Sequence, residues 1–230
     1  MLFRQLFDST SSTYTYLLAD AGEAVLIDPV KDKQDDYLRL LGELNLRLTL
    51  ALDTHTHADH ITALGDLRSA TGCRCGLGEQ SASTCASFVF TDGDHLPFGN
   101  CALTVWYTPG HTDDSYCFLL PAADGRPIKL FSGDTLLIRG TGRTDFQNGD
   151  AREQWASLQR LLALPGDTEV WPGHDYHGWT SSSIAEEAAH NPRLQVANAR
   201  AYAALMAELK LPDPKLMDIA VPANRACGQK

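Results

Sequence analysis

The sequence predicts an α/β protein in which two β-sheets pack face to face and helices cover their outer faces. Two observations lead to this class. Strand-like runs and helical patterns alternate through both halves of the chain, and four of the runs end in a tight turn that carries a histidine or an aspartate. Because 230 residues suit one hydrophobic core, we expect a single domain over residues 1–230.

The first half opens with strands and then adds a helix. Apolar and β-branched runs separated by turn residues predict the opening strands. Residues 33–45 place apolar side chains at helical spacing, which predicts an amphipathic helix, and a second helix is expected at about 60–70. The strands expected in this half are 3–7, 13–19, 23–29 and 48–52.

The second half repeats a strand followed by a turn. The turns are Pro-Gly-His, Gly-Asp and Pro-Gly-His, and turns at strand ends can converge on one rim of a sheet. A capping box from Ser183 to Glu186 opens one helix, and the Asn-Pro dipeptide at 191–192 ends it. The expected strands are 102–108, 128–132 and 168–171, and the expected helices are 151–163, 182–190 and 194–209.

The composition limits the class of partner. The formal net charge is −10, whereas nucleic-acid-binding domains usually carry a basic surface. The first twenty residues lack the apolar core of a signal peptide and the arginines of a transit peptide, and no apolar run is long enough for a membrane span. We therefore expect no nucleic-acid partner, no membrane partner and a cytoplasmic location.

Six cysteines are scattered along the chain, and Cys73 and Cys75 are the only close pair. Their spacing fits neither a C-x-x-C zinc pattern nor a disulfide framework. We therefore expect six reduced thiols.

The stretch THTHADH at 54–60 holds four metal-competent groups in seven residues. Such a cluster is rare by chance, and three more candidates stand in the strand-end turns, so the sequence predicts a metal site. By contrast, His95 in a turn and His190 at a helix end are expected to be solvated or to cap an element. The metal candidates are His55, His57, Asp59, His60, His111, Asp134 and His174.

These motifs together resemble the metallo-β-lactamase superfamily. The order H-x-H-x-D-H, PGH, GD and PGH is its pattern, and it implies an αββα sandwich of two mixed sheets with the metals at one edge. The segments FSGDTLLIRGTGRTDFQ, PGHDYHG, NPRL and AVPAN resemble one branch of it, the persulfide dioxygenases of the ethylmalonic encephalopathy protein family. The resemblance extends from about Phe3 to Gly228.

The resemblance implies one non-haem Fe(II) per chain, held by His55, His111 and Asp134. Two imidazoles and one carboxylate suit Fe(II) and leave three adjacent positions open, where a sulfur substrate and O2 can bind side by side. The remaining candidates would then orient ligands or move protons as a supporting layer. They are His57, Asp59, His60 and His174.

Spacing alone leaves a dinuclear site open. Hydrolases of this fold bind two metals at equivalent positions, and every residue type that they use is present here. The single iron is therefore an implication of the resemblance to one branch.

The implied substrate is glutathione persulfide, which carries two carboxylates and an ionisable terminal sulfur. Arg139 and Arg143 lie on a glycine-rich loop just after Asp134, where a guanidinium could bind a carboxylate with two hydrogen bonds. For Arg139 an internal pair with an acidic neighbour is the alternative. The resemblance also favours Tyr176 and Arg193 as substrate contacts.

We therefore expect a persulfide dioxygenase that adds both atoms of O2 to the terminal sulfur and releases sulfite and glutathione. The main alternative is a dinuclear thioester hydrolase of the glyoxalase II type. A nuclease is opposed by the negative charge, and a non-catalytic sulfide-responsive binder is opposed by the intact metal positions. The oligomeric state is left open, with a homodimer as the assembly considered.

Overall fold

The computed structural model describes residues 1–122, 124–209, 211 and 216–229. These residues form two compact units. Unit 1 holds residues 1–90 and 96–102 with the C-terminal segment, and unit 2 holds residues 91–95 and 103–212 apart from the residues not described. The expectation of a single domain over residues 1–230 stays a prediction.

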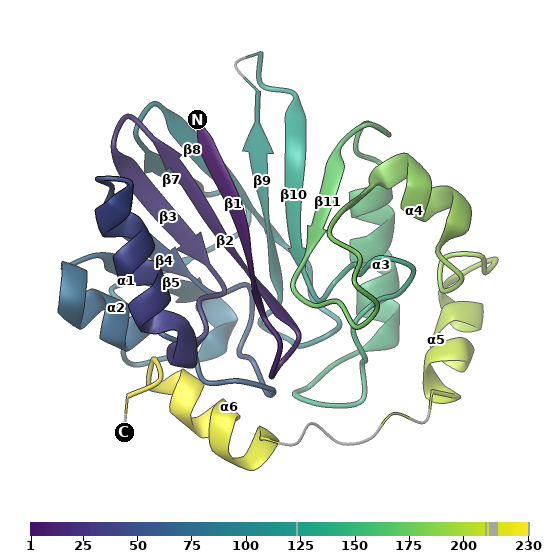
Figure 1. The fold of residues 1–230 in the computed structure, drawn as a ribbon. Helices are drawn as coiled ribbons and strands as arrows, with labels where there is room; N and C mark the ends of the chain where they lie inside the picture. Colours follow the sequence, from purple (N-terminus) through teal and green to yellow (C-terminus); the bar gives the residue numbers. More distant parts are fainter. Residues whose placement is uncertain (123, 210, 212–215, 230) are drawn as a thin grey trace. The chain divides into compact units, whose positions relative to one another are not determined.

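The sheet of unit 1 is mixed and six-stranded, with its strands in sequence order (Figure 1). The first two pairings are antiparallel and the last three are parallel. The strands are β1 (Leu2–Asp8), β2 (Thr13–Asp20), β3 (Glu23–Ile27), β4 (Arg47–Leu52), β5 (Arg74–Gly78) and β6 (Phe88–Phe90).

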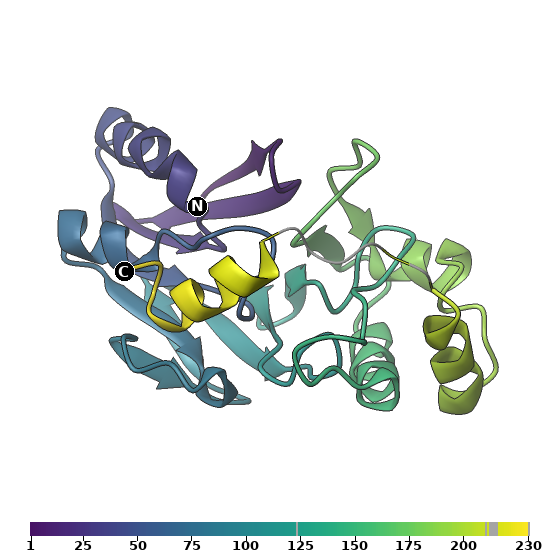
Figure 2. The same cartoon turned by 90° about the horizontal axis from the view of Figure 1, so that it is seen from below.

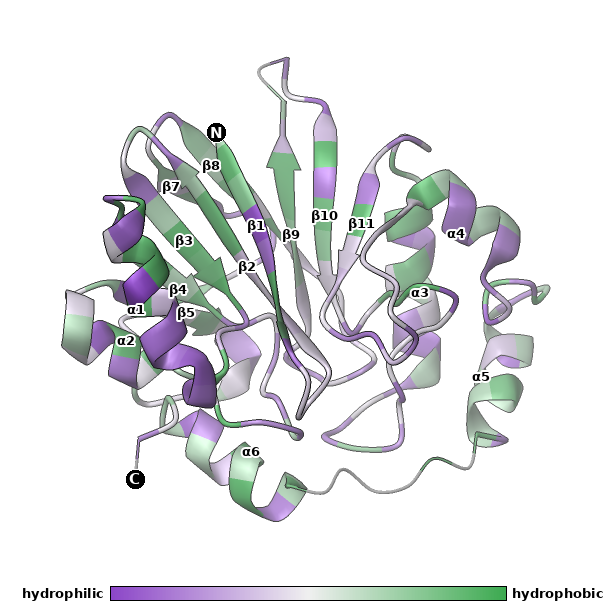
Figure 3. Cartoon of the chain, viewed as in Figure 1, coloured by the Kyte–Doolittle hydropathy of each residue, from purple (hydrophilic) through white to green (hydrophobic). Residues whose placement is uncertain are grey.

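Two helices cover one face of this sheet. α1 (Gln34–Glu43) buries Tyr37 and Leu41, and α2 (Leu64–Thr71) buries Leu64 and Leu67. These side chains share one hydrophobic cluster with residues of β2 to β5. The cluster forms because packing against the sheet removes the apolar face of each helix from water. Figure 3 shows the same division, since α1 alternates hydrophilic and hydrophobic residues while β3 is mostly hydrophobic.

The C-terminal helix α6 (Met217–Arg225), yellow in Figure 2, also belongs to unit 1. Its carboxyl end lies against the loop that follows β4, because Asn224 hydrogen-bonds to the backbone of that loop. The helix contains Pro222 and is followed by Cys227 and Gly228. No helix was expected in this segment.

The second sheet is also mixed and six-stranded, in the order β12-β11-β10-β9-β8-β7. The β10–β11 pair is parallel, and β8–β9, β9–β10 and β11–β12 are antiparallel. The strands are β7 (His95–Phe98), β8 (Cys101–Tyr107), β9 (Tyr116–Pro121), β10 (Pro127–Gly133), β11 (Glu169–Pro172) and β12 (Ser182–Ser183).

Three helices pack on the sheet of unit 2. Leu158 of α3 (Ala151–Leu162), Ile184 of α4 (Ile184–His190) and Tyr202 of α5 (Ala199–Ala207) share a hydrophobic cluster with residues of β9, β10 and β11. Asp150, Ser183 and Asn198 cap these helices, each accepting a backbone N–H of the first turn. Among the described residues, none of the helices combines the length and the apolar character that a membrane span requires.

The two mixed sheets and their helices confirm the α/β class, and all seven expected strands are present. Strands β5, β6, β7, β9 and β12 were not expected. Three helices begin at least two residues later than expected: α4 by two residues, α2 by about four and α5 by five. In each case a residue before the helix has another role. Thr62 forms a β-bridge before α2, Ser182 lies in β12 before α4, and Asn198 is the N-cap of α5.

One expectation is wrong. Cys85 and Cys227 form a disulfide across 142 residues of sequence, so the six cysteines are not all reduced thiols. Cysteine spacing in the sequence indicates only pairs that are close along the chain. Cys85 and Cys227 come together because the C-terminal segment packs against the rest of unit 1. The four other cysteines are free.

Candidate metal site

The THTHADH stretch forms the loop after β4 and has almost no contact with solvent. His55, His57 and His60 are at most 4% exposed, so they are not solvated side chains. Their rings lie in a row, with centroids 4.1 Å apart for His55 and His57 and 4.3 Å apart for His57 and His60. Buried imidazoles in contact require fixed hydrogen-bond partners.

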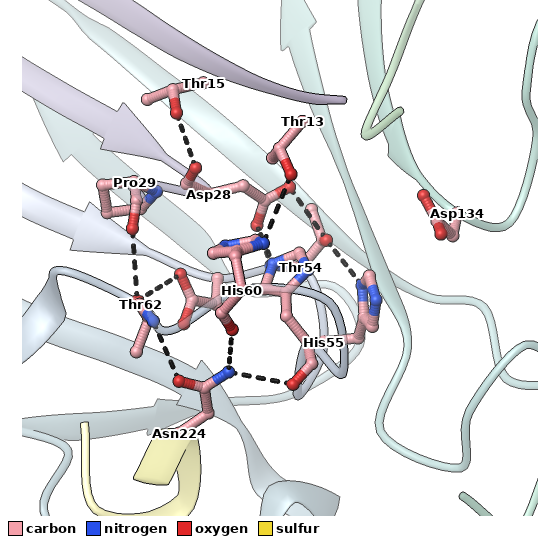
Figure 4. A network of polar contacts seen from close by, with 12 residues as sticks. Thr13, Thr15, Asp28, Pro29, Thr54, His55, His60, Thr62, Asp134 and Asn224 are labelled. Carbon is pink, nitrogen blue, oxygen red and sulfur yellow. Dashed lines mark hydrogen bonds and ion pairs between the residues drawn. The ribbon is translucent and has the colours of Figure 1, made fainter. Parts of the chain in front are cut away.

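Asp28, at the end of β3, organises the first part of this loop (Figure 4). Its Oδ1 accepts hydrogen bonds from the backbone N–H of Thr54 at 2.7 Å and from Nε2 of His57 at 3.1 Å, and its Oδ2 accepts from the Thr54 hydroxyl at 3.0 Å. Its backbone has a φ of 52°, in the left-handed region that aspartate enters more readily than most residues. Burial acts to lower the pKa of His57, but the charge and hydrogen bond of Asp28 raise that pKa to about 9.

This arrangement also determines how His55 presents its ring. The Thr54 hydroxyl donates its single proton to Asp28, so its oxygen must accept from Nδ1–H of His55, 3.0 Å away. The lone pair of His55 is then on Nε2, which is the atom that can bind a metal. Asp28 and Thr54 were not predicted as site residues from the sequence. A signal for Asp28 was present, because it is a polar residue directly after a buried strand, as the other candidates are.

Asp59 and His60 form a second pair in the loop. Nδ1 of His60 lies 2.9 Å from Oδ2 of Asp59, and the Thr13 hydroxyl of β2 lies within 3.3 Å of both atoms. Asp59 is partly exposed whereas His60 is buried. The pair is therefore a carboxylate that orients an imidazole.

In unit 2 the turns after β10 and β11 and the turn after β8 bring three predicted residues together. Asp134 lies between His111 and His174: its Oδ2 is 3.6 Å from Nε2 of His111, and its Oδ1 is 2.7 Å from Nδ1 of His174. His111 donates Nδ1–H to the carbonyl of Arg143 at 2.6 Å, which leaves its lone pair on Nε2, toward Asp134. A 3.6 Å separation is too long for a strong hydrogen bond and suits two atoms that bind one ion.

Two glycines allow this close packing. A Cβ on Gly142 would lie 2.6 Å from Nδ1 of His111 and 2.5 Å from the carbonyl oxygen of Asp134. A Cβ on Gly173 would lie 2.8 Å from Oδ1 of Asp134. The Gly-Thr-Gly and Pro-Gly-His segments therefore use glycine so that the backbone can approach the candidate ligands.

The three candidate arginines of unit 2 have different surroundings. Arg139 pairs with Glu186 and with the fully buried Glu187, so its charge is neutralised inside the unit. This is the internal pair with an acidic neighbour that the sequence left open as the alternative to a substrate contact. Arg143 makes two hydrogen bonds to Asp145, of 2.7 and 2.9 Å, and lies over the ring of Phe146. The hydrogen bond from Arg143 lowers the pKa of Asp145.

Arg193 lacks such a carboxylate. Its guanidinium donates to the carbonyl and to the hydroxyl of Thr141, the latter at 3.1 Å, and no acidic residue of the described chain pairs with it. Burial lowers the pKa of this guanidinium. Tyr176 is 66% exposed, and its ring lies parallel to that of His174 with the centroids 6.2 Å apart. Both residues therefore offer groups that a ligand could use, and the role of all the predicted site residues stays a prediction.

Comparison with known proteins defines the class first. The model of the metallo-beta-lactamase superfamily matches residues 9–76 and 87–174, more than half of the chain. The chain therefore has the metallo-β-lactamase fold, as the motifs predicted.

More similar proteins narrow the class. The chain is 44% identical over 232 aligned residues to the human protein "Persulfide dioxygenase ETHE1, mitochondrial", covering 99% of this chain and 89% of that protein. The crystal structure of ETHE1 from Myxococcus xanthus matches it with a TM-score of 0.94 and 51% identity, covering 100% of both chains. A hydroxyacylglutathione hydrolase of Francisella tularensis subsp. novicida is 31% identical over 174 residues, 75% of this chain and 67% of that protein. The chain belongs to the persulfide dioxygenase family of the metallo-β-lactamase superfamily.

Proposed function

We propose that this protein oxidises glutathione persulfide with O2 at a single Fe(II) held by His55, His111 and Asp134. Membership of the persulfide dioxygenase family supports the reaction. The observation that carries the choice of ligands is the orientation of the two histidines. In both of them Nδ1 is occupied by a hydrogen bond from the ring to protein oxygen, so that Nε2 carries the lone pair.

The donor set fits ferrous iron. Two neutral imidazoles and one carboxylate suit Fe(II) and leave adjacent positions for two reactants. Once bound, the iron would supply the redox chemistry by which both atoms of O2 reach the terminal sulfur, so that hydrolysis yields sulfite and glutathione. None of the four free cysteines is needed as a ligand.

The other metal-competent residues hold the ligands in place. Asp28 fixes Thr54 and His57, and through Thr54 it fixes the ring of His55. His174 hydrogen-bonds to Asp134, which limits the directions from which that carboxylate can bind a metal. Such partners commonly contribute about 10–100-fold to metal affinity or activity.

Binding of the substrate is assigned to unit 2. Arg193 would bind a carboxylate of glutathione, because its partly buried charge gains a carboxylate partner only when the substrate is present. Tyr176 would contribute its exposed ring and hydroxyl. Arg143 remains a proposed contact, although it would have to share its guanidinium with Asp145. The cytoplasmic location and a homodimer remain predictions.

A dinuclear thioester hydrolase is the second candidate function. The similarity to the Francisella hydroxyacylglutathione hydrolase favours it, and Asp59, His60 and His174 provide donors for a second metal. The greater identity to persulfide dioxygenases, over nearly the full length of the chain, favours the first proposal.

Metal content and gas consumption distinguish the two functions. We expect anaerobically purified protein to contain about one iron and little zinc per chain, and to consume O2 when glutathione persulfide is added. Two tightly bound metals per chain, with hydrolysis of a glutathione thioester and no O2 uptake, would instead establish the hydrolase.

A further inference from the structure

Asn224, near the end of α6, reaches the metal-binding loop from more than 160 residues away along the chain. Its side chain is buried, and all of its amide atoms face that loop (Figure 4). The Nδ2 group donates to the carbonyl of His57 at 2.9 Å and to the carbonyl of His60 at 2.8 Å, and Oδ1 accepts from the backbone N–H of Thr62 at 2.8 Å. One side chain thus binds three backbone groups of the segment 57–62.

These three backbone groups need a partner from outside the loop. Residues 57–61 form neither a helix nor a strand, and His57, His60 and Thr62 are buried. A buried carbonyl or N–H without a partner destabilises the folded state, because it has lost its hydrogen bonds to water. Asn224 supplies both donors and the acceptor at once, which only a primary amide can do.

The result is that the loop is held from two sides. Asp28 binds the ring of His57 through Nε2, while Asn224 binds the backbone of the same residue. Asp28 also orients His55 through Thr54. The position of His55 therefore depends on a loop whose two supports come from β3 and from the C-terminal helix.

The end of α6 is itself firmly attached to unit 1. Cys227 forms the disulfide with Cys85, and its carbonyl accepts from the N–H of Gly65 at 2.9 Å. Lys31 donates to the carbonyl of Gly228 at 2.6 Å, and a Cβ at Gly228 would lie 2.1 Å from the carbonyl oxygen of Thr62. Asn224 is therefore carried by a segment with little room to move.

We propose that Asn224 is a positioning residue for the metal centre, so that the C-terminal helix is part of the machinery that retains iron. The inference rests on the proposed function, because it takes His55 as a ligand of one Fe(II). Loss of the Asn224 amide would free the carbonyls of His57 and His60, let the segment 57–62 shift, and misplace His55.

The test compares Asn224→Ala and Asn224→Ser with the parent protein. Each protein is loaded with one Fe(II) under anaerobic conditions, and the release of iron to an excess of a ferrous chelator is followed in time. We expect release to be about 10–100-fold faster in the alanine variant and intermediate in the serine variant, whose hydroxyl can still donate one hydrogen bond. We also expect kcat to fall while KM for glutathione persulfide stays within twofold, because the proposed substrate contacts are not on this loop.

The matched control is Tyr37→Phe, which removes a buried hydroxyl of the same unit. The Tyr37 hydroxyl bonds to Thr15 at 2.9 Å and accepts from the N–H of Val30 at 3.1 Å. This variant should melt at a lower temperature and yet release iron at the parent rate. The comparison therefore separates positioning of the loop from general loss of stability.

Each outcome has one meaning. Parent-like iron release in both Asn224 variants overturns the inference, and so does equally fast release in the control at an equal loss of melting temperature. If the alanine variant does not fold, the serine variant decides by the same criterion. A parent that binds two metals or no iron refutes the proposed function instead, before any variant is compared.

Discussion

Replacement of Arg193 by methionine is the most direct test of how the substrate is bound. Methionine keeps an apolar stem of similar length and removes only the charge and its hydrogen bonds. In the folded protein those bonds go to the carbonyl and the hydroxyl of Thr141, and no carboxylate of the described chain neutralises the guanidinium. The positive charge is therefore kept in a partly buried place without an internal partner.

The size of the effect follows from these contacts. A charge-assisted hydrogen bond contributes about 1.5–3 kcal/mol, so loss of the contact with a substrate carboxylate should raise KM for glutathione persulfide about 10- to 150-fold. The protein itself should lose little stability, because the lost bonds to Thr141 are offset by removal of a desolvated charge. A net change of about 1 kcal/mol would shift the melting temperature of a chain of this size by about 2–4 °C.

The assay is steady-state O2 uptake against the concentration of glutathione persulfide, with iron content and melting temperature measured on the same samples. Arg200→Met is the matched control, since Arg200 is an exposed arginine on α5 of the same unit. We expect an unchanged KM in the control and an unchanged iron content in both variants. A parent-like KM in folded, iron-loaded Arg193→Met protein would show that this residue does not bind the substrate.

Three further predictions concern other contacts of the structure. Arg139→Met leaves the buried carboxylate of Glu187 without its cation, so the free energy of unfolding should fall by about 1–3 kcal/mol with KM unchanged; a large rise in KM at full stability would contradict this structural role. Replacing Cys85 and Cys227 together by serine opens a loop closed across 142 residues and should cost about 2–4 kcal/mol in denaturant unfolding, whereas an unchanged midpoint would mean that the bridge does not form. Asp59→Ala should slow turnover and weaken iron retention while the metal count stays at one per chain. A count that falls from two to one by elemental analysis would favour the dinuclear hydrolase.

The sequence by itself determined most of the strands and the candidate metal residues in the turns that follow them, because both depend on local sequence pattern. The alternation of apolar runs and turns placed β1 to β4 of unit 1 and β8, β10 and β11 of the second sheet, and each candidate metal residue stands where such a run stops, as His55 does after β4 and Asp134 after β10. These assignments succeed because the period of a strand and the chemistry of the turn that ends it are both encoded within about ten neighbouring residues. The motif order also indicated the family, which the comparisons confirm.

Only the tertiary structure decided which side chains serve one another. Nothing near Asn224 in the sequence connects it with the backbone of His57, and nothing near Cys85 indicates Cys227 as its partner. Neither does spacing distinguish Arg139, which is neutralised by Glu187, from Arg193, which has no such partner among the described residues. The reason is physical: a hydrogen bond or an ion pair depends on distances of about 3 Å, and these distances are set by how segments far apart in the chain pack together.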